Sequence, residues 1–285
     1  MKILALNGSV RKYGNSEILL KHALMAAEAE GAQVEILNLT DYDIGPCRGC
    51  GLCLFRDNVC QVKDSTHEIF EKVDACDGLI LGAPCYFLEL TAIVKQLIDR
   101  CWIIGHNKIG KPAKPACVLV PYATRGWIPY VFTQANILFN VMCLTKINQA
   151  AICTQGISEV VLNQEGMDTA ARFGREIVEA VRTKDFTYRG EKGVCPQCHD
   201  KLLRVMSDME TIECPTCGVR GKLSLVDGKI DVKFAEKVFA ESHAILVNSY
   251  NHYTYHIAPS KDYFLRTKDE RKNKSQKYRE YLAKK

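Results

Sequence analysis

The stretch that decides the fold is Lys2-Ile-Leu-Ala-Leu6, followed by Asn7-Gly-Ser-Val-Arg-Lys-Tyr-Gly-Asn-Ser16. The first run is short and apolar, which is typical of a strand that is buried on both faces. From residue 16 to residue 30 the apolar side chains recur with helical spacing, and Gly31 ends the pattern. A strand that enters a helix through such a loop predicts the first βα unit of a parallel sheet.

The same alternation continues along the chain. Further apolar runs occur at residues 34–39, 78–82, 116–121 and 148–153, with helical stripes at residues 90–101 and 173–181. The pattern predicts a doubly wound α/β fold with a five-stranded parallel sheet. Ligands bind outside the carboxyl ends of the strands in this fold, so the loops at that edge are the candidates for function.

Composition predicts one main domain with an appendage, since 285 residues with 47% hydrophobic content exceed the needs of one core. We place the units at residues 1–188, 194–230 and 231–285, the last being a helical extension with a basic tail. Residues 266–285 hold nine Lys and Arg against three Asp and Glu, so the remainder is nearly neutral. No apolar run is long enough for a membrane span, and 14 cysteines without a leader favour the reducing cytoplasm.

The loop after the first strand has the composition of a phosphate site. Backbone N–H groups at a helix amino terminus attract anions, and short polar side chains with one arginine add donors. A dinucleotide fingerprint, G-x-G-x-x-G, is absent, so a mononucleotide is the better ligand. The alternative is an ordinary turn with a helix cap. The candidate phosphate ligands are Ser9, Arg11, Gly14, Asn15 and Ser16.

This loop resembles the G-S-x-R-x-x-G-N-S loop of NADPH-dependent FMN reductases, which are flavodoxin-like proteins. The stretch Ala83-Pro-Cys-Tyr-Phe87 is similar to the loop that the family runs along the flavin ring. The resemblance spans residues 1–183 and implies bound FMN and the strand order 2-1-3-4-5. The loop at residues 122–127 departs from the glycine-richer family pattern. The ring contacts implied are Pro84, Cys85, Tyr86 and Phe87, with Thr124, Arg125 and Gly126 from the third loop.

Four cysteines, Cys47, Cys50, Cys53 and Cys60, fall within fourteen residues. Thiolates at such close spacing can surround several irons, and glycines between them let the backbone turn tightly. The run resembles that of iron–sulfur flavoproteins, which implies that these cysteines bind a [4Fe–4S] cluster. A zinc site, a thiol pair or free cysteines are the alternatives.

A second group consists of two Cys-x-x-Cys pairs, Cys195 with Cys198 and Cys214 with Cys217. Their spacing matches a four-cysteine zinc ribbon, in which a structural metal replaces the hydrophobic core that a small module lacks. Iron of the rubredoxin type is the alternative. His199, beside one pair, is expected at the surface.

Together these features predict an FMN- and [4Fe–4S]-dependent oxidoreductase, with flavin-centred chemistry and no separate catalytic residue. It would take electrons from a reduced carrier, ferredoxin or NAD(P)H, and pass them to a small acceptor. One alternative is a cluster-free NAD(P)H-dependent FMN or quinone reductase. Another is a redox-sensing module that docks protein or nucleic acid through the ribbon and basic tail, although nucleic acid is not our expected partner. The resemblance also implies a homo-oligomer, a dimer or a tetramer.

Overall fold

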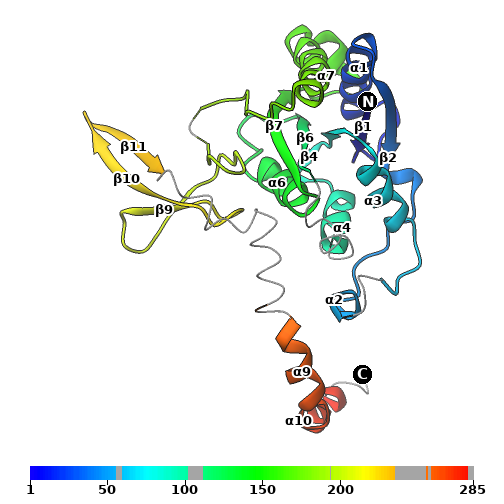
Figure 1. Ribbon diagram of the computed structural model, residues 1–285, viewed down its shortest axis with the longest axis vertical. Coiled ribbons are helices and arrows are strands. Elements are labelled where there is room, and N and C mark those ends of the chain that lie inside the picture. Colours follow the sequence, from blue (N-terminus) through cyan, green and yellow to red (C-terminus); the bar gives the residue numbers. More distant parts are fainter. Residues whose placement is uncertain (56–59, 102–111, 193, 235–254, 256–257, 282–285) are drawn as a thin grey trace.

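The computed structural model describes residues 1–55, 60–101, 112–192, 194–234, 255 and 258–281. Its centre is a five-stranded parallel sheet in the order β2-β1-β3-β6-β7, which confirms the predicted order 2-1-3-4-5 (Figure 1). The strands are β1 (Lys2–Asn7), β2 (Gln33–Asn38), β3 (Gly78–Gly82), β6 (Lys114–Tyr122) and β7 (Leu144–Cys153).

Helices cover both faces of this sheet. On one face, α1 (Asn15–Ala29) and α7 (Gln164–Thr183) pack over Ile3, Ala5 and Ile80. These two helices approach so closely that a Cβ on Gly174 would lie 2.0 Å from the carbonyl oxygen of Ala23. The opposite face is covered by α3 (Thr66–Ala75), α4 (Ala92–Arg100) and α6 (Val131–Val141).

Shorter elements lie at the carboxyl edge of the sheet. They are η1 (Leu39–Asp41), α2 (Leu52–Phe55), the hairpin β4 (Cys85–Tyr86) and β5 (Glu89–Leu90), and η3 (Glu159–Leu162). The sequence pattern predicts that a helix begins at Leu90, but Leu90 belongs to strand β5 of this hairpin. Its turn residues, Phe87 and Leu88, both have positive φ, 47° and 74°. Such values are unfavourable for large side chains and are found where surrounding structure enforces them.

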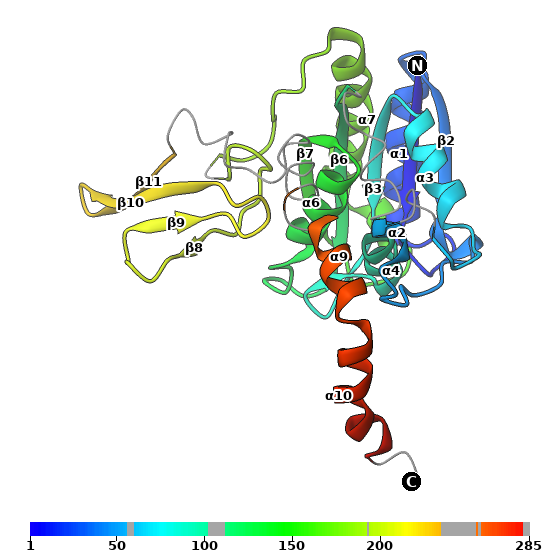
Figure 2. The same ribbon diagram turned by 60° about the horizontal axis from the view of Figure 1, so that its bottom comes forward.

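The second cysteine module forms a four-stranded antiparallel sheet beside β7 (Figure 2). Its strands are β8 (Arg204–Val205), β9 (Thr211–Glu213), β10 (Arg220–Val226) and β11 (Lys229–Phe234). The sequence predicts a helical extension from residue 231, but residues 231–234 belong to β11, and residues 235–254 lie outside the described residues. Strand β11 also crosses the boundary that the sequence predicts at residue 230. The division into three units otherwise stays a prediction.

The carboxyl-terminal helices stand apart from both sheets. They are α9 (Ala258–Arg266) and α10 (Lys268–Glu280), and neither contains a buried residue. Figure 2 shows α10 pointing away from the body. Among the described helices, none combines the length and the apolar character needed to cross a membrane.

Candidate active site and metal centres

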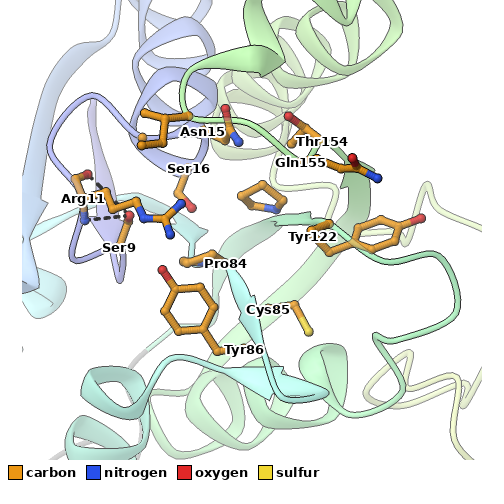
Figure 3. Close-up of a pocket in the computed structure, with 14 residues that line it drawn as sticks. Ser9, Arg11, Asn15, Ser16, Pro84, Cys85, Tyr86, Tyr122, Thr154 and Gln155 are labelled. Atoms are coloured by element: carbon orange, nitrogen blue, oxygen red, sulfur yellow. Dashed lines mark hydrogen bonds between the residues drawn. The ribbon is translucent and has the colours of Figure 1, made fainter.

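A pocket opens at the carboxyl edge of the sheet, where the loops after β1, β3, β6 and β7 meet (Figure 3). The structure brings eight of the predicted contact residues together there: Ser9, Arg11, Gly14, Asn15, Ser16, Pro84, Cys85 and Tyr86. Four others, Phe87, Thr124, Arg125 and Gly126, are not among the residues that line it. The chain completes the lining with Pro121, Tyr122, Ala123, Thr154, Gln155 and Ile157.

The loop after β1 is held by its own hydrogen bonds. The backbone N–H of Ser9 donates to Asn7 Oδ1 at 3.1 Å, and the N–H of Arg11 donates to Ser9 Oγ at 3.2 Å. At its base, a Cβ on Gly8 would lie 2.7 Å from Val94 Cγ2, so this position needs glycine. The loop is therefore fixed before any ligand binds.

Two hydroxyl groups of the pocket lining have no hydrogen-bond partner among the described residues. They are Ser16 Oγ, in the first turn of α1, and Thr154 Oγ1, just after β7. Both residues are buried, at 1% and 6% exposure. An unsatisfied buried hydroxyl costs about 1–3 kcal/mol. A polar ligand that accepts from both groups would remove this cost, and a flavin phosphate at the amino end of α1 fits this requirement.

Asn15 lines the pocket as the sequence predicts, and its side chain also makes hydrogen bonds to the segment after β7. Its side-chain Nδ2 donates to the carbonyl of Gly156 at 2.8 Å, and its Oδ1 accepts from the N–H of Val160 at 3.2 Å. Both bonds tie the segment after β7 to the start of α1. Asn15 therefore ties the segment that carries Thr154 and Ile157 to the pocket.

The four cysteines at residues 47–60 line a second cavity of about 290 Å³. Cys47 and Cys50 are exposed, whereas Cys53 and Cys60 are half-buried. Gly49 and Gly51 adopt left-handed φ values of 61° and 68°, as expected for a backbone that turns around a bound group. Backbone N–H groups of Gly49 and Val62 donate to Cys47 and Cys60, each at 3.4 Å.

These sulfurs surround a space and do not converge on one point. Within the described ranges, only one group of three or more Cys, His, Asp or Glu has ligand atoms all within 4.8 Å, and the loop cysteines are not in it. A single tetrahedral zinc ion with bonds of about 2.3 Å needs sulfurs roughly 3.8 Å apart. The loop geometry is too wide for one ion and leaves room for a larger inorganic group.

The cavity has a buried charged wall. Arg100, at the end of α4, pairs with Asp64 at 2.6 Å, and both side chains are 1% exposed. Burial would raise the pKa of Asp64, yet hydrogen bonds from Arg100, Thr66 and Gly45 lower it to about 2. Burial and the neighbouring cysteines raise the pKa of the Cys53 thiol, so a bound metal would have to displace that proton.

Helix α4 runs from the base of the loop after β1 to the four-cysteine cavity. At its amino end, Thr91 Oγ1 donates to the carbonyl of Gly8 at 2.6 Å, directly below the loop after β1. At its other end, Arg100 lines the four-cysteine cavity. Nine residues of helix separate them, which is roughly 13 Å at 1.5 Å per residue.

The remaining four cysteines form the group that does converge. Cys195, Cys198, Cys214 and Cys217 are buried, and their sulfurs lie 3.4 Å (Cys195 to Cys217) and 3.5 Å (Cys198 to Cys214) apart. These separations approach the spacing around one tetrahedral ion. The group can therefore bind a single metal ion.

Two matching turns hold these cysteines. The N–H of His199 donates to the carbonyl of Cys195 at 2.9 Å, and the N–H of Gly218 donates to that of Cys214 at 2.8 Å. Both residues have positive φ, 56° and 77°. His199 was expected at the surface, which is wrong, because it is partly buried and its ring stacks on Tyr188 at 4.2 Å.

Buried polar contacts attach this module to the main sheet. Lys146 Nζ, on β7, donates to the carbonyl of His199 at 2.9 Å, and Thr133 Oγ1 on α6 donates to Asp200 Oδ1 at 3.0 Å. Lys146 lies near the amino end of β7, and Thr154 follows its carboxyl end. At 3.3 Å per residue this is roughly 26 Å, so the module is distant from the pocket.

Comparisons with known proteins agree with this geometry. Residues 1–153 match the NADPH-dependent FMN reductase family. An iron–sulfur flavoprotein of Methanocaldococcus jannaschii is 39% identical over 195 residues, which are 64% of this chain and 98% of that protein.

Two further matches extend across the carboxyl-terminal part. A flavone synthase of Aspergillus candidus is 26% identical over 286 residues, covering 87% of this chain and 86% of its own. The solved structure of a flavone reductase superposes with a TM-score of 0.81 at 20% identity, covering 100% of this chain and 99% of that one. The ribbon and terminal helices are thus part of a fold that another protein shares. The chain belongs to the NADPH-dependent FMN reductase family, together with the iron–sulfur flavoproteins, and is a flavin-dependent oxidoreductase.

Proposed function

We propose that this chain binds FMN in the pocket beside α1 and a [4Fe–4S] cluster at Cys47, Cys50, Cys53 and Cys60, and that it transfers electrons between a reduced carrier and a small acceptor. FMN accepts two electrons together and can release them singly, whereas a cluster carries one at a time. The observation that carries the proposal is that α4 follows Thr91, which contacts the loop after β1, and ends at Arg100, which lines the four-cysteine cavity, a helical rise of roughly 13 Å.

Different residues of this chain would bind the flavin and the cluster. Ser16 and Thr154 offer unpartnered buried hydroxyls to the flavin, and Arg11 adds a positive charge at the pocket, where Figure 3 shows it extending toward Ser16. Pro84, Cys85 and Tyr86 line the other side of the pocket. The Cys53 and Cys60 side of the cavity faces the protein, and the Cys47 and Cys50 side faces solvent. A carrier protein could therefore approach the cluster without entering the flavin pocket.

The electron donor and the cofactors are tested together by rapid mixing. Protein purified without oxygen is mixed with NADPH, NADH or reduced ferredoxin, and the flavin and cluster absorbances are followed in time. We expect one donor to reduce both centres of the wild-type protein. In Cys50→Ser, we expect NAD(P)H to reduce the flavin alone. Full turnover in Cys50→Ser would instead favour the cluster-free reductase. Protein that binds no flavin would contradict both.

A planar conjugated ketone is the acceptor class that specific observations favour. Four exposed aromatic side chains lie on the segments after β3 and β6: Tyr86, which lines the pocket, and Phe87, Trp127 and Tyr130, which do not. Their two segments are joined, because Cys85 Sγ donates to the Trp127 carbonyl at 3.0 Å and the N–H of Tyr130 donates to the Leu88 carbonyl at 3.2 Å. Aromatic faces stack on flat ligands, and one relative is named a flavone synthase.

Acceptor choice is testable with flavone against a small quinone. Phe87→Ala and Trp127→Ala should each raise KM for flavone about fivefold, the value of one lost aromatic contact of ~1 kcal/mol. Val205→Ala, an exposed apolar change in the ribbon, is the matched control. Equal effects on the quinone would remove the planar-acceptor assignment.

The proposal has three further parts. The cysteines at 195, 198, 214 and 217 would hold structural zinc, since Lys146, which contacts their module, lies roughly 26 Å along β7 from Thr154 in the pocket, too far for an electron relay. The chain would act as a homo-oligomer in the cytoplasm. The exposed basic helix α10 would allow the terminal extension to dock an acidic partner. Binding of an acidic protein or nucleic acid that weakens with salt would reveal this role.

A further inference from the structure

Beneath the four-cysteine loop lies a buried ion pair that the proposed chemistry leaves without a role. Arg100 Nη1 contacts Asp64 Oδ2 at 2.6 Å, and Arg100 Nη2 contacts Asp64 Oδ1 at 3.2 Å. Both side chains are 1% exposed. Surface ion pairs contribute little to stability, but a fork-like pair that is fully desolvated fixes both partners in one geometry. Its position is therefore determined tightly.

This pair fixes both ends of the loop. Upstream of the cysteines, Arg100 donates to the carbonyl of Gly45 at 2.8 Å, and Asp64 accepts from the N–H of Gly45 at 2.9 Å. Downstream, Asp64 accepts from the N–H of Thr66 at 3.1 Å. The segments that enter and leave the cysteine loop are thus joined through one buried pair.

The arginine also reaches a sulfur. Arg100 Nη2 donates to Cys60 Sγ at 3.2 Å, so this cation is in direct contact with a loop cysteine. A cysteine that binds a cluster does so as thiolate, and the cluster gains one further negative charge when it is reduced. A hydrogen bond from a positive group to a ligand sulfur therefore stabilises the reduced state more than the oxidised state.

We propose that Arg100 is a positioning residue for the cluster: it orients Cys60 as a ligand and raises the reduction potential of the bound group. The inference rests on the proposed [4Fe–4S] site. Asp64 fixes the guanidinium and keeps its two Nη atoms directed at Gly45 and Cys60. The effect is local to the loop, because the proposed flavin pocket has no lining residue from the end of α4 that carries Arg100.

Three variants separate charge, geometry and folding. Arg100→Lys keeps the charge but loses the fork. The double change Asp64→Asn with Arg100→Met removes both buried charges, so no carboxylate is left unpaired. Arg172→Met is the matched control, because it removes a cation from an exposed pair with Glu176 on α7, which packs on the other face of the sheet.

The measurement is an anaerobic redox titration followed by electron paramagnetic resonance, with iron and FMN content determined on the same samples. At a fixed ambient potential near the midpoint of the wild-type protein, the neutral double variant should show a tenfold smaller ratio of reduced to oxidised cluster. For a one-electron couple this equals a shift of 59 mV to lower potential. The cluster potential of Arg100→Lys should shift less, and the cluster potential of Arg172→Met and the flavin potentials should not move.

The outcomes distinguish this inference from the proposed function. Wild-type protein without iron would remove the cluster proposal itself. Wild-type protein with a cluster, together with variants whose cluster potentials equal that of Arg172→Met, would overturn the role of Arg100 alone. If the double variant fails to fold, Arg100→Lys decides the matter, since an unchanged potential and an unchanged electron paramagnetic resonance line shape would also overturn it.

Discussion

The two four-cysteine groups of this chain are built in opposite ways. In the ribbon, all four sulfurs are buried, with neighbouring pairs 3.4 and 3.5 Å apart. In the loop at residues 47–60, two sulfurs are exposed and all four surround a cavity of about 290 Å³. One group is shaped for a single ion, and the other leaves space for a group with its own bulk.

Each group has a different buried cation. Lys146 lies below the ribbon, where burial lowers its pKa to about 8, and its ammonium contacts a carbonyl and an amide oxygen. Arg100 lies below the loop and is paired with Asp64. The comparison teaches that cysteine spacing alone does not define a metal site. The turns around the cysteines and the charge behind them decide what is bound.

The largest expected effect is the loss of the ribbon. Cys214→Ser should abolish zinc binding, because structural zinc contributes about 10–16 kcal/mol in small zinc modules and this module has little other core. Zinc content and limited proteolysis after residue 190 would measure it. Cys143→Ser, in neither group, is the control. Retained zinc with a protease-resistant ribbon would contradict the account.

The loop should respond selectively. Cys50→Ser should remove iron and acid-labile sulfide but leave FMN and zinc, because the loop lies at the other end of α4 from the pocket. Visible spectra and elemental analysis measure the result. If FMN is lost together with the iron, the two sites are inseparable, and the comparison between independent centres fails.

A smaller effect concerns the attachment of the ribbon. Lys146→Met should destabilise the docked ribbon by about 1–3 kcal/mol, because it leaves the His199 carbonyl and Gln149 Oε1 buried without their donor. Denaturant unfolding followed by zinc release measures this change. Lys222→Met, whose partner Glu210 is exposed, is the matched control inside the ribbon. Equal unfolding curves for the two variants would show that Lys146 does not couple the units.

The smallest effect is a dependence on pH at the loop. Asp64 has its pKa lowered to about 2 from 3.8, so its stabilising contribution is present above pH 4 and is lost as pH falls through 2. We compare Cys50→Ser with the double variant Cys50→Ser and Asp64→Asn. The single variant should have the higher free energy of unfolding, and the difference between the two should shrink by roughly 2 kcal/mol from pH 4 to pH 2. A difference independent of pH would mean that Arg100 does not hold this carboxylate ionised.

Much of the fold could be predicted because apolar runs mark buried parallel strands. All five predicted strands overlap β1, β2, β3, β6 and β7. The loop after β1 could be found because its polar residues are contiguous. Phe87 shows the limit of this reasoning: it is adjacent to the pocket in sequence, but a turn with positive φ leaves it 93% exposed.

The missed residues act across long sequence separations. Thr154 reaches the pocket only because β7 lies beside β6, although a threonine directly after a strand at the carboxyl edge was a usable signal. Arg100 and Asp64 are 36 positions apart. Lys146 is a buried lysine in an apolar strand, and no pattern in the sequence names its partner in the ribbon.

The most direct test of two unlike metal centres is X-ray absorption at the iron and zinc edges of anaerobically prepared wild-type protein. The account predicts an iron signal with sulfur and neighbouring iron scatterers, as in a [4Fe–4S] cluster. It also predicts a zinc signal with four sulfurs and no metal neighbour. Zinc in both groups, or iron without a second iron nearby, would contradict it.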